Sequence, residues 1–178
     1  IDNKSVAQRI LTSPYSPLGH DTHIDSKNAT CVVLATNQPV HPDRNKGDLM
    51  RIDNKEQPFH PVYNYSFITD LEEGLILTDV NTLADGELRN NFLTRQLTWN
   101  PDGILNGAKH ITLAGYYAYI STPKGIVIVN LDDPLKPKLV KSVALNNAKA
   151  SALQFRFLLV VDDDGLKTID VTKPELAF

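Results

Sequence analysis

The chain has 178 residues, of which 42% are hydrophobic and 22% are charged, and its formal net charge is -3 at pH 7. This composition is that of a folded globular protein and excludes a wholly disordered chain. The 18 basic residues are scattered, which argues against a dedicated nucleic-acid surface, since phosphate binding needs a clustered excess of Lys and Arg. No apolar stretch of the sequence approaches the roughly 18 residues that a membrane-spanning helix needs.

The first 28 residues read as an irregular N-terminal segment, and they hold the clearest group of candidate metal ligands. His20 and His23 lie three residues apart, with Asp21 between them. Imidazole and carboxylate groups are suitable ligands for zinc and other divalent ions. These three residues are a candidate metal site, with His60 as a further ligand if the fold brings it close. The alternative is a surface loop that merely contains two histidines, because the pattern defines no complete ligand set.

A strand-turn-strand pattern recurs along the rest of the chain. In each copy an apolar strand is followed by a short polar loop, a glycine and a second strand that ends in Asp or Asn. Three copies are clear and a fourth is weaker. The clear copies span residues 65–80, 117–131 and 157–171, and the weaker one pairs residues 31–36 with residues 47–53. Repetition at this scale predicts a repeat architecture.

The second strands of these copies predict sheets that stack face to face. Leu75–Leu77 and Ile126–Val129 are apolar at every position, whereas a strand with one wet face should alternate between apolar and polar residues. Unbroken apolar runs therefore indicate burial on both faces, as in a β-propeller. The run Leu166-Lys167-Thr168-Ile169 is more polar, as expected of a strand near an end of the stack.

Turn chemistry explains the residues at both ends of these second strands. Glycine supplies the positive φ that a tight hairpin needs, and Asp or Asn caps a turn through its own side chain. The opening glycines are Gly74, Gly125 and Gly165, and the closing residues are Asp79, Asn130 and Asp170. Gly125 and Gly165 are 40 residues apart, close to the roughly 40–45 residues of a four-stranded propeller blade.

The remaining strands are expected between the hairpins. Residues 92–99 and 138–145 are predicted as third strands of their blades, and residues 108–113 and 148–153 as fourth strands. The acidic turn Asp162–Asp164 is a second place where a cation such as Ca²⁺ could bind, since that ion takes oxygen ligands. A solvated turn is the alternative, because the alternating acids of a calcium loop are absent. The sequence contains no nucleophile elbow and no phosphate-binding loop.

The copies resemble the LVIVD-repeat family of β-propellers. The resemblance covers about residues 63–178 and is strongest in two places: Tyr117–Ser121 with the following run Ile126–Lys138, and Gly165–Pro174. It implies a propeller within a large secreted or surface-attached bacterial or archaeal protein, with no catalytic motif to carry over. The copy at residues 65–80 departs from the family pattern, because no proline follows its closing Asp79.

We therefore expect an all-β fold with about three to four antiparallel propeller blades over residues 29–178, in a piece cut from a longer protein. The expected function is a non-catalytic binding or scaffolding module of a larger extracytoplasmic protein. Its expected partners are the remainder of that protein or another protein chain, and neither nucleic acid nor a cofactor. The alternative is a metal-dependent enzyme or metal-binding module that uses His20, Asp21 and His23.

Overall fold

The computed structural model describes residues 24–36, 60–81 and 93–178, and it confirms an all-β fold. Within these residues, 11 strands form three antiparallel sheets, and the only other regular elements are short 3₁₀ turns. Neighbours in each sheet follow the order of the sequence. No helix of the described residues has the length and apolarity to cross a membrane.

The first sheet contains β1 (Ala29–Leu34), β2 (Tyr65–Asp70), β3 (Gly74–Asp79) and β4 (Thr94–Trp99). The second contains β5 (His110–Ala114), β6 (Tyr117–Thr122), β7 (Gly125–Asn130) and β8 (Lys138–Ala144). The third contains β9 (Ala150–Gln154), β10 (Phe157–Asp162) and β11 (Gly165–Asp170). The 3₁₀ turns are η1 (Pro61–Asn64), η4 (Pro101–Gly103) and η5 (Pro174–Leu176).

The three clear hairpins form as predicted, and so do the third strands, which are β4 and β8. The assignment of fourth strands was wrong. Residues 108–113 and 148–153 were expected to complete the preceding sheets, but β5 and β9 pair with β6 and β10 and so begin the following sheets. The reason is local, because two-residue turns with positive φ at Gly115 (60°) and Phe155 (54°) fold each strand directly onto its successor.

The weak fourth copy also takes a different form. β1 pairs along its length with β2, so it begins the first sheet. Its expected partner, residues 47–53, lies outside the described residues.

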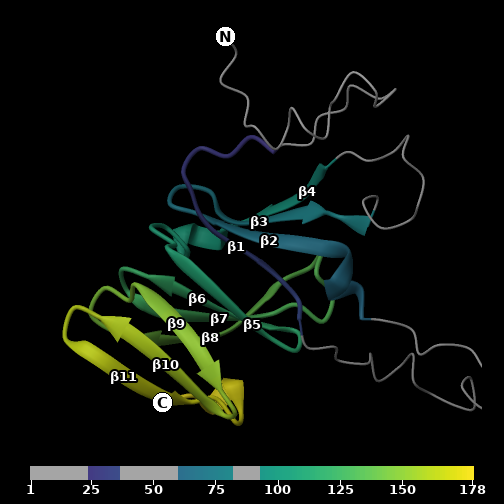
Figure 1. The fold of residues 1–178 in the computed structure, drawn as a ribbon. Coiled ribbons are helices and arrows are strands. Elements are labelled where there is room, and N and C mark those ends of the chain that lie inside the picture. Colours follow the sequence, from purple (N-terminus) through teal and green to yellow (C-terminus); the bar gives the residue numbers. More distant parts are fainter. Residues whose placement is uncertain (1–23, 37–59, 82–92) are drawn as a thin grey trace, which may run out of the picture.

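The sheets stack in chain order with their first strands side by side. β1 lies against β5, and β5 lies against β9, while the second and third strands extend outward from this seam (Figure 1). Hydroxyl groups connect the seam: Thr30 Oγ1 lies 2.8 Å from the carbonyl oxygen of Ala108, and Thr112 Oγ1 lies 2.9 Å from that of Ser151. Each sheet is therefore fastened to the next at its first strand.

Two hydrophobic cores fill the spaces between the sheets, and β7 contributes to both. Val127 and Val129 belong to the core between the first and second sheets, whereas Ile126 and Ile128 belong to the core between the second and third. These four side chains are at most 3% exposed. The prediction that this unbroken apolar strand is buried on both faces is confirmed.

A buried carboxylate anchors the chain before β1 to the first sheet. Asp70 is fully buried, and its Oδ2 accepts hydrogen bonds from Ser26 Oγ and from the N–H of Asn28, both at 2.5 Å. Its Oδ1 accepts from the N–H groups of Glu72 and Glu73 at 2.7 and 2.9 Å. Burial alone raises the pKa of Asp70, but these hydrogen bonds outweigh it and lower the pKa to about 2.

We expect Asp70→Asn to lower the free energy of unfolding by about 2 kcal/mol at neutral pH, because the amide cannot accept all four hydrogen bonds. The folded-state pKa is below the unfolded value of 3.8, so this stabilisation is complete above about pH 4 and disappears as the pH falls toward 2. Thermal melts against pH should show the acid loss in the unmutated protein and a flatter profile in the variant. Asp102→Asn, in an exposed turn, is the control, and equal profiles for all three proteins would contradict the assignment.

Two glycines at corresponding turn positions differ in their surroundings. Gly125 has φ +126° and Gly165 has φ +121°, so both need the freedom of glycine. A Cβ atom on Gly125 would lie 2.1 Å from the carbonyl oxygen of Val143 in β8, whereas nothing lies within 4 Å of a Cβ atom on Gly165. The difference arises because the third sheet has no fourth strand in the described residues.

We expect Gly165→Ala to cost about 1–3 kcal/mol from backbone strain alone. Gly125→Ala should cost clearly more, because it also forces β8 away from β7. Urea unfolding of the two variants beside the unmutated protein measures this difference. Equal losses of stability would show that β8 does not press on Gly125 in solution.

Candidate interaction surface

Of the four residues considered for the histidine metal site, the structure describes His60 alone. His20, Asp21 and His23 lie outside the described residues. Within the described ranges, no group of three or more His, Cys, Asp or Glu side chains is arranged to hold a metal ion.

His60, the further ligand considered from the sequence, is buried and engaged in structural contacts. Its Nδ1 accepts a hydrogen bond from the N–H of Val62 at 3.1 Å, which caps η1. Its Nε2 lies 3.2 Å from Asp132 Oδ1, and its ring stacks on Tyr116 with centroids 5.7 Å apart. His60 therefore joins η1 to the loop after β7.

The acidic turn considered for calcium binding is also held by protein contacts. Asp162 Oδ1 accepts from the N–H of Asp164 at 2.9 Å. Asp163 accepts hydrogen bonds from Lys149 Nζ and Asn147 Nδ2, both at 2.8 Å, and these contacts lower its pKa. Asp162 Oδ1 thus caps the turn between β10 and β11, and Asp163 joins that turn to the segment before β9. Asp162 Oδ2 is buried and has no hydrogen-bond partner among the described residues.

The third sheet exposes an apolar face on the side away from the second sheet. Leu158, Val160 and Ile169 point into the core, whereas Val161 and Leu166, a cross-strand pair, are 46% and 68% exposed. We call this side the third outer face, and its strands contribute Ala152, Leu159, Val161, Leu166 and Thr168.

Corresponding positions in the second sheet are buried. The two hairpins align through their glycines, since Gly125 pairs with Thr122 and Gly165 pairs with Asp162. Leu166 then corresponds to Ile126, which is fully buried against the third sheet. The third outer face therefore carries an apolar residue where the neighbouring sheet uses one to pack.

The first sheet shows the same feature on its opposite side. Val32 and Leu34 are 64% and 52% exposed, and they share that side with Ile68 and the buried Ile76. We call this side the first outer face. Val32 pairs with Ile68 as Ile111 pairs with Ile120 in the second sheet, where Ile111 is 2% exposed. The exposed apolar positions of this face lie on β1, whereas Ser66, Ile76 and Thr78 of its middle strands are at most 8% exposed. Arg95 bonds there to Glu73 and to the carbonyl oxygen of Asp25.

The edge of the third sheet is open along β11. The N–H of Asp170 donates to the carbonyl oxygen of Phe178 at 3.2 Å. In the second sheet the corresponding residue, Asn130, pairs with Lys138, which like Phe178 lies eight residues further along the chain. Phe178 therefore stands where a fourth strand would begin. No strand of the described residues pairs with the rest of that edge, and such edges accept added strands.

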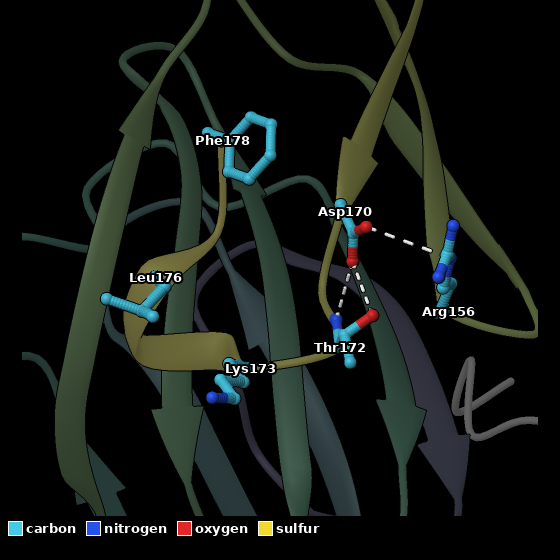
Figure 2. A pocket seen from close by; sticks show the side chains of 6 residues that line it. All are labelled: Arg156, Asp170, Thr172, Lys173, Leu176 and Phe178. Atoms are coloured by element: carbon cyan, nitrogen blue, oxygen red, sulfur yellow. Dashed lines mark hydrogen bonds and ion pairs between the residues drawn. The ribbon is translucent and has the colours of Figure 1, made fainter.

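A pocket of about 270 Å³ lies at the end of this sheet (Figure 2). The Asp170 carboxylate in this pocket accepts hydrogen bonds from the hydroxyl and the N–H of Thr172 at 2.6 and 2.9 Å, and these bonds lower the pKa of Asp170. The Arg156 guanidinium lies 4.8 Å from the centre of the Phe157 ring. The remaining lining residues are Lys173, Leu176 and Phe178. This combination of cations and apolar groups suits contact with a polypeptide.

Sequence reasoning did not single out Val161, Leu166 or Val32. The signal was present in the alignment of the hairpins, because Leu166 follows its glycine as Ile126 does. A second signal concerned the sheet boundaries: Leu105–Lys109 and Leu145–Lys149 are similar in sequence, and they immediately precede β5 and β9, the first strands of the second and third sheets.

Comparison of the chain with protein-family models, with curated proteins and with solved structures finds no match.

The metal hypothesis from the sequence predicts about one equivalent of bound divalent metal, which the double variant His20→Ala/His23→Ala should lose. Elemental analysis of the purified protein measures this directly. His41→Ala, a substitution outside the proposed ligand group, serves as the control. Sub-stoichiometric metal in the unmutated protein, or metal retained by the double variant, would contradict the hypothesis.

Proposed function

We propose that this chain is part of a β-propeller that acts as a non-catalytic binding or scaffolding module of a larger extracytoplasmic protein. The observation that carries the proposal is the exposed apolar third outer face at one end of the stack. Side chains such as Leu166 and Val32 occupy positions that pack against a neighbouring sheet elsewhere in the fold. Large apolar residues gathered on one surface typically mark an interaction site.

The arrangement of the sheets supports a propeller. Each antiparallel sheet begins at a common seam of first strands, and the chain then passes outward through the sheet before it enters the next. Propellers typically have four to eight such sheets around an axis. The three sheets of the described residues leave the third outer face to be covered, by the remainder of the parent protein or by another protein chain.

The polar groups support binding over catalysis. The side chains of His60, Asp70 and Asp163 make hydrogen bonds that hold turns or strand connections. A catalytic acid or base instead has to reach a substrate. The extracytoplasmic setting rests on the resemblance to LVIVD-repeat propellers, whose members are parts of large secreted or surface-attached proteins.

Photocrosslinking tests the proposal in cells that make the protein. Leu166 is replaced by benzoyl-phenylalanine, and we expect a covalent adduct with a polypeptide, because a partner covers this position. The adduct is detected by its mass shift and identified by peptide sequencing.

The control carries the same group at Phe155, which is 88% exposed in the turn between β9 and β10 and belongs to neither outer face. We expect few adducts from this position. Adduct yields from Leu166 no higher than those from Phe155 would contradict a binding role for the third outer face.

A further inference from the structure

We infer that an extended segment of a second polypeptide adds to the open edge of β11 and becomes the fourth strand of the third sheet. The added strand runs antiparallel to β11, with a hydroxyl-bearing residue opposite Lys167 and a large apolar residue opposite Leu166. This inference rests on the proposed binding role of the third outer face and names the way in which the partner covers it. Addition of a strand to an exposed sheet edge is an established mode of peptide recognition.

The first argument concerns the main-chain groups along this edge. The N–H of Val171 donates to the carbonyl oxygen of Arg156 at 2.8 Å, on the side of β10. Successive residues of a strand turn these groups to opposite sides, so the N–H and C=O groups of Asp170, Thr168 and Leu166 point away from β10. The N–H of Asp170 is already bonded at the end of the edge. In the part of the chain that the structure describes, no strand pairs with the other two residues on that side.

The second argument is that the space for an added strand is open. In the first two sheets the fourth strand passes over the glycine that opens the third strand. A Cβ atom on Gly74 would lie 3.0 Å from the carbonyl oxygen of Trp99 in β4, and one on Gly125 would lie 2.1 Å from that of Val143 in β8. Nothing lies within 4 Å of a Cβ atom on Gly165. The edge of β11 therefore has room where the other two sheets hold a strand.

The third argument identifies the apolar side chain that the partner needs. In the row next to the hairpin glycine, Leu75 pairs with Trp99 in the first sheet and Ile126 pairs with Val143 in the second. Trp99 and Val143 each pack against the hydrophobic core on that side of their sheet. Leu166 holds the same place in the third sheet and is 68% exposed. A large apolar residue opposite Leu166 removes this side chain from water.

The next row gives a second requirement for the partner. Thr98 pairs with Ile76 in the first sheet, and Ser142 pairs with Val127 in the second. In both fourth strands a hydroxyl-bearing residue thus comes directly before the large apolar one. The corresponding residue of β11 is Lys167, and a hydroxyl oxygen opposite it can accept a hydrogen bond from its ammonium group.

The strand and the face are covered together. Among the described residues, the two segments that serve as fourth strands, β4 and β8, are fixed in other sheets. The exposed apolar residues continue from β11 onto β10, where Val161 is 46% exposed and pairs with Leu166. A second polypeptide can supply both the added strand and the surface that covers this pair.

A synthetic peptide with the sequence of residues 138–144 tests the inference, because this segment forms β8 on the corresponding edge of β7. The peptide carries a fluorescent label, and its anisotropy is measured against the concentration of the purified full chain. We expect saturable binding. Val143→Lys in the peptide should weaken binding at least about tenfold, because the contact with Leu166 is lost.

Thr168→Pro is the most informative variant of the protein. Proline removes the outward N–H and blocks the added strand, yet it leaves the bonds between β10 and β11 in place, as proline on an edge strand does. We expect binding to fall at least about tenfold, while circular dichroism shows a folded protein. Thr168→Ala is the matched control, because it keeps the N–H and should bind as the unmutated protein does.

Leu166→Lys provides a second loss that does not depend on the tolerance of the strand for proline. Its side chain is already 68% exposed, so the variant should remain folded and bind at least about tenfold more weakly.

Hydrogen exchange locates the bound peptide. The N–H groups of Leu166 and Thr168 should exchange rapidly in the free protein and at least about tenfold more slowly with the peptide bound. The N–H of Ile169 points toward β10 and should change little. Slow exchange at Leu166 and Thr168 in the free protein would overturn the inference, because another part of this chain would then cover the edge.

A lack of saturable binding, or binding that survives Thr168→Pro or Leu166→Lys, would also overturn the inference. An adduct at position 166 in cells without binding of the peptide would reject strand addition and leave the proposed binding module standing. Peptide binding together with an absence of crosslinks in cells would instead count against the proposed function. The two proposals can therefore fail separately.

Discussion

Packing on both faces of β7 is the constraint on which the described fold depends. Alternate side chains of one six-residue strand enter two different cores, so the second sheet holds the first and third sheets in place. A polar residue at any of the four central positions would be buried without water on either side. The run Ile126–Val129 is therefore both a strand and the joint between two layers. The apolar residues on the outer faces follow the same logic, because a sheet built to pack on both sides has no wet face.

Much of the fold could be predicted from local patterns. The glycine before each second strand and the Asp or Asn after it located the hairpins, because both signals act over a few residues. The assignment of β5 and β9 could not be made in this way. Residues 108–113 lie between the predicted strand 92–99 and the hairpin that begins at Tyr117, and a two-residue turn at Gly115, which was not recognised as a hairpin, decides the pairing. That single turn therefore determines which sheet β5 joins.

The candidate surface was harder to predict than the fold, because exposure is a property of neighbours. Leu166 and Ile126 are each the apolar residue that follows a hairpin glycine, yet Ile126 is fully buried and Leu166 is 68% exposed. Only the absence of a further sheet beyond β11 in the described residues separates them. The polar candidates show the converse: His60 and Asp163 drew attention as ligands, whereas their contacts in the structure hold turns. Residue type alone does not distinguish a ligand from a turn cap.

The connectivity of the sheets has a consequence for the order of folding. The second sheet is complete within residues 110–144, so its strand pairs close only short loops. The first sheet must bring β1 onto β2 across residues 35–64, and the entropy lost on closing a loop increases with its length. We therefore expect the second sheet to act as the nucleus, with β1 joining late. The hydrogen bonds from Ser26 and Asn28 to Asp70 then form last, after the other strands of the first sheet have paired.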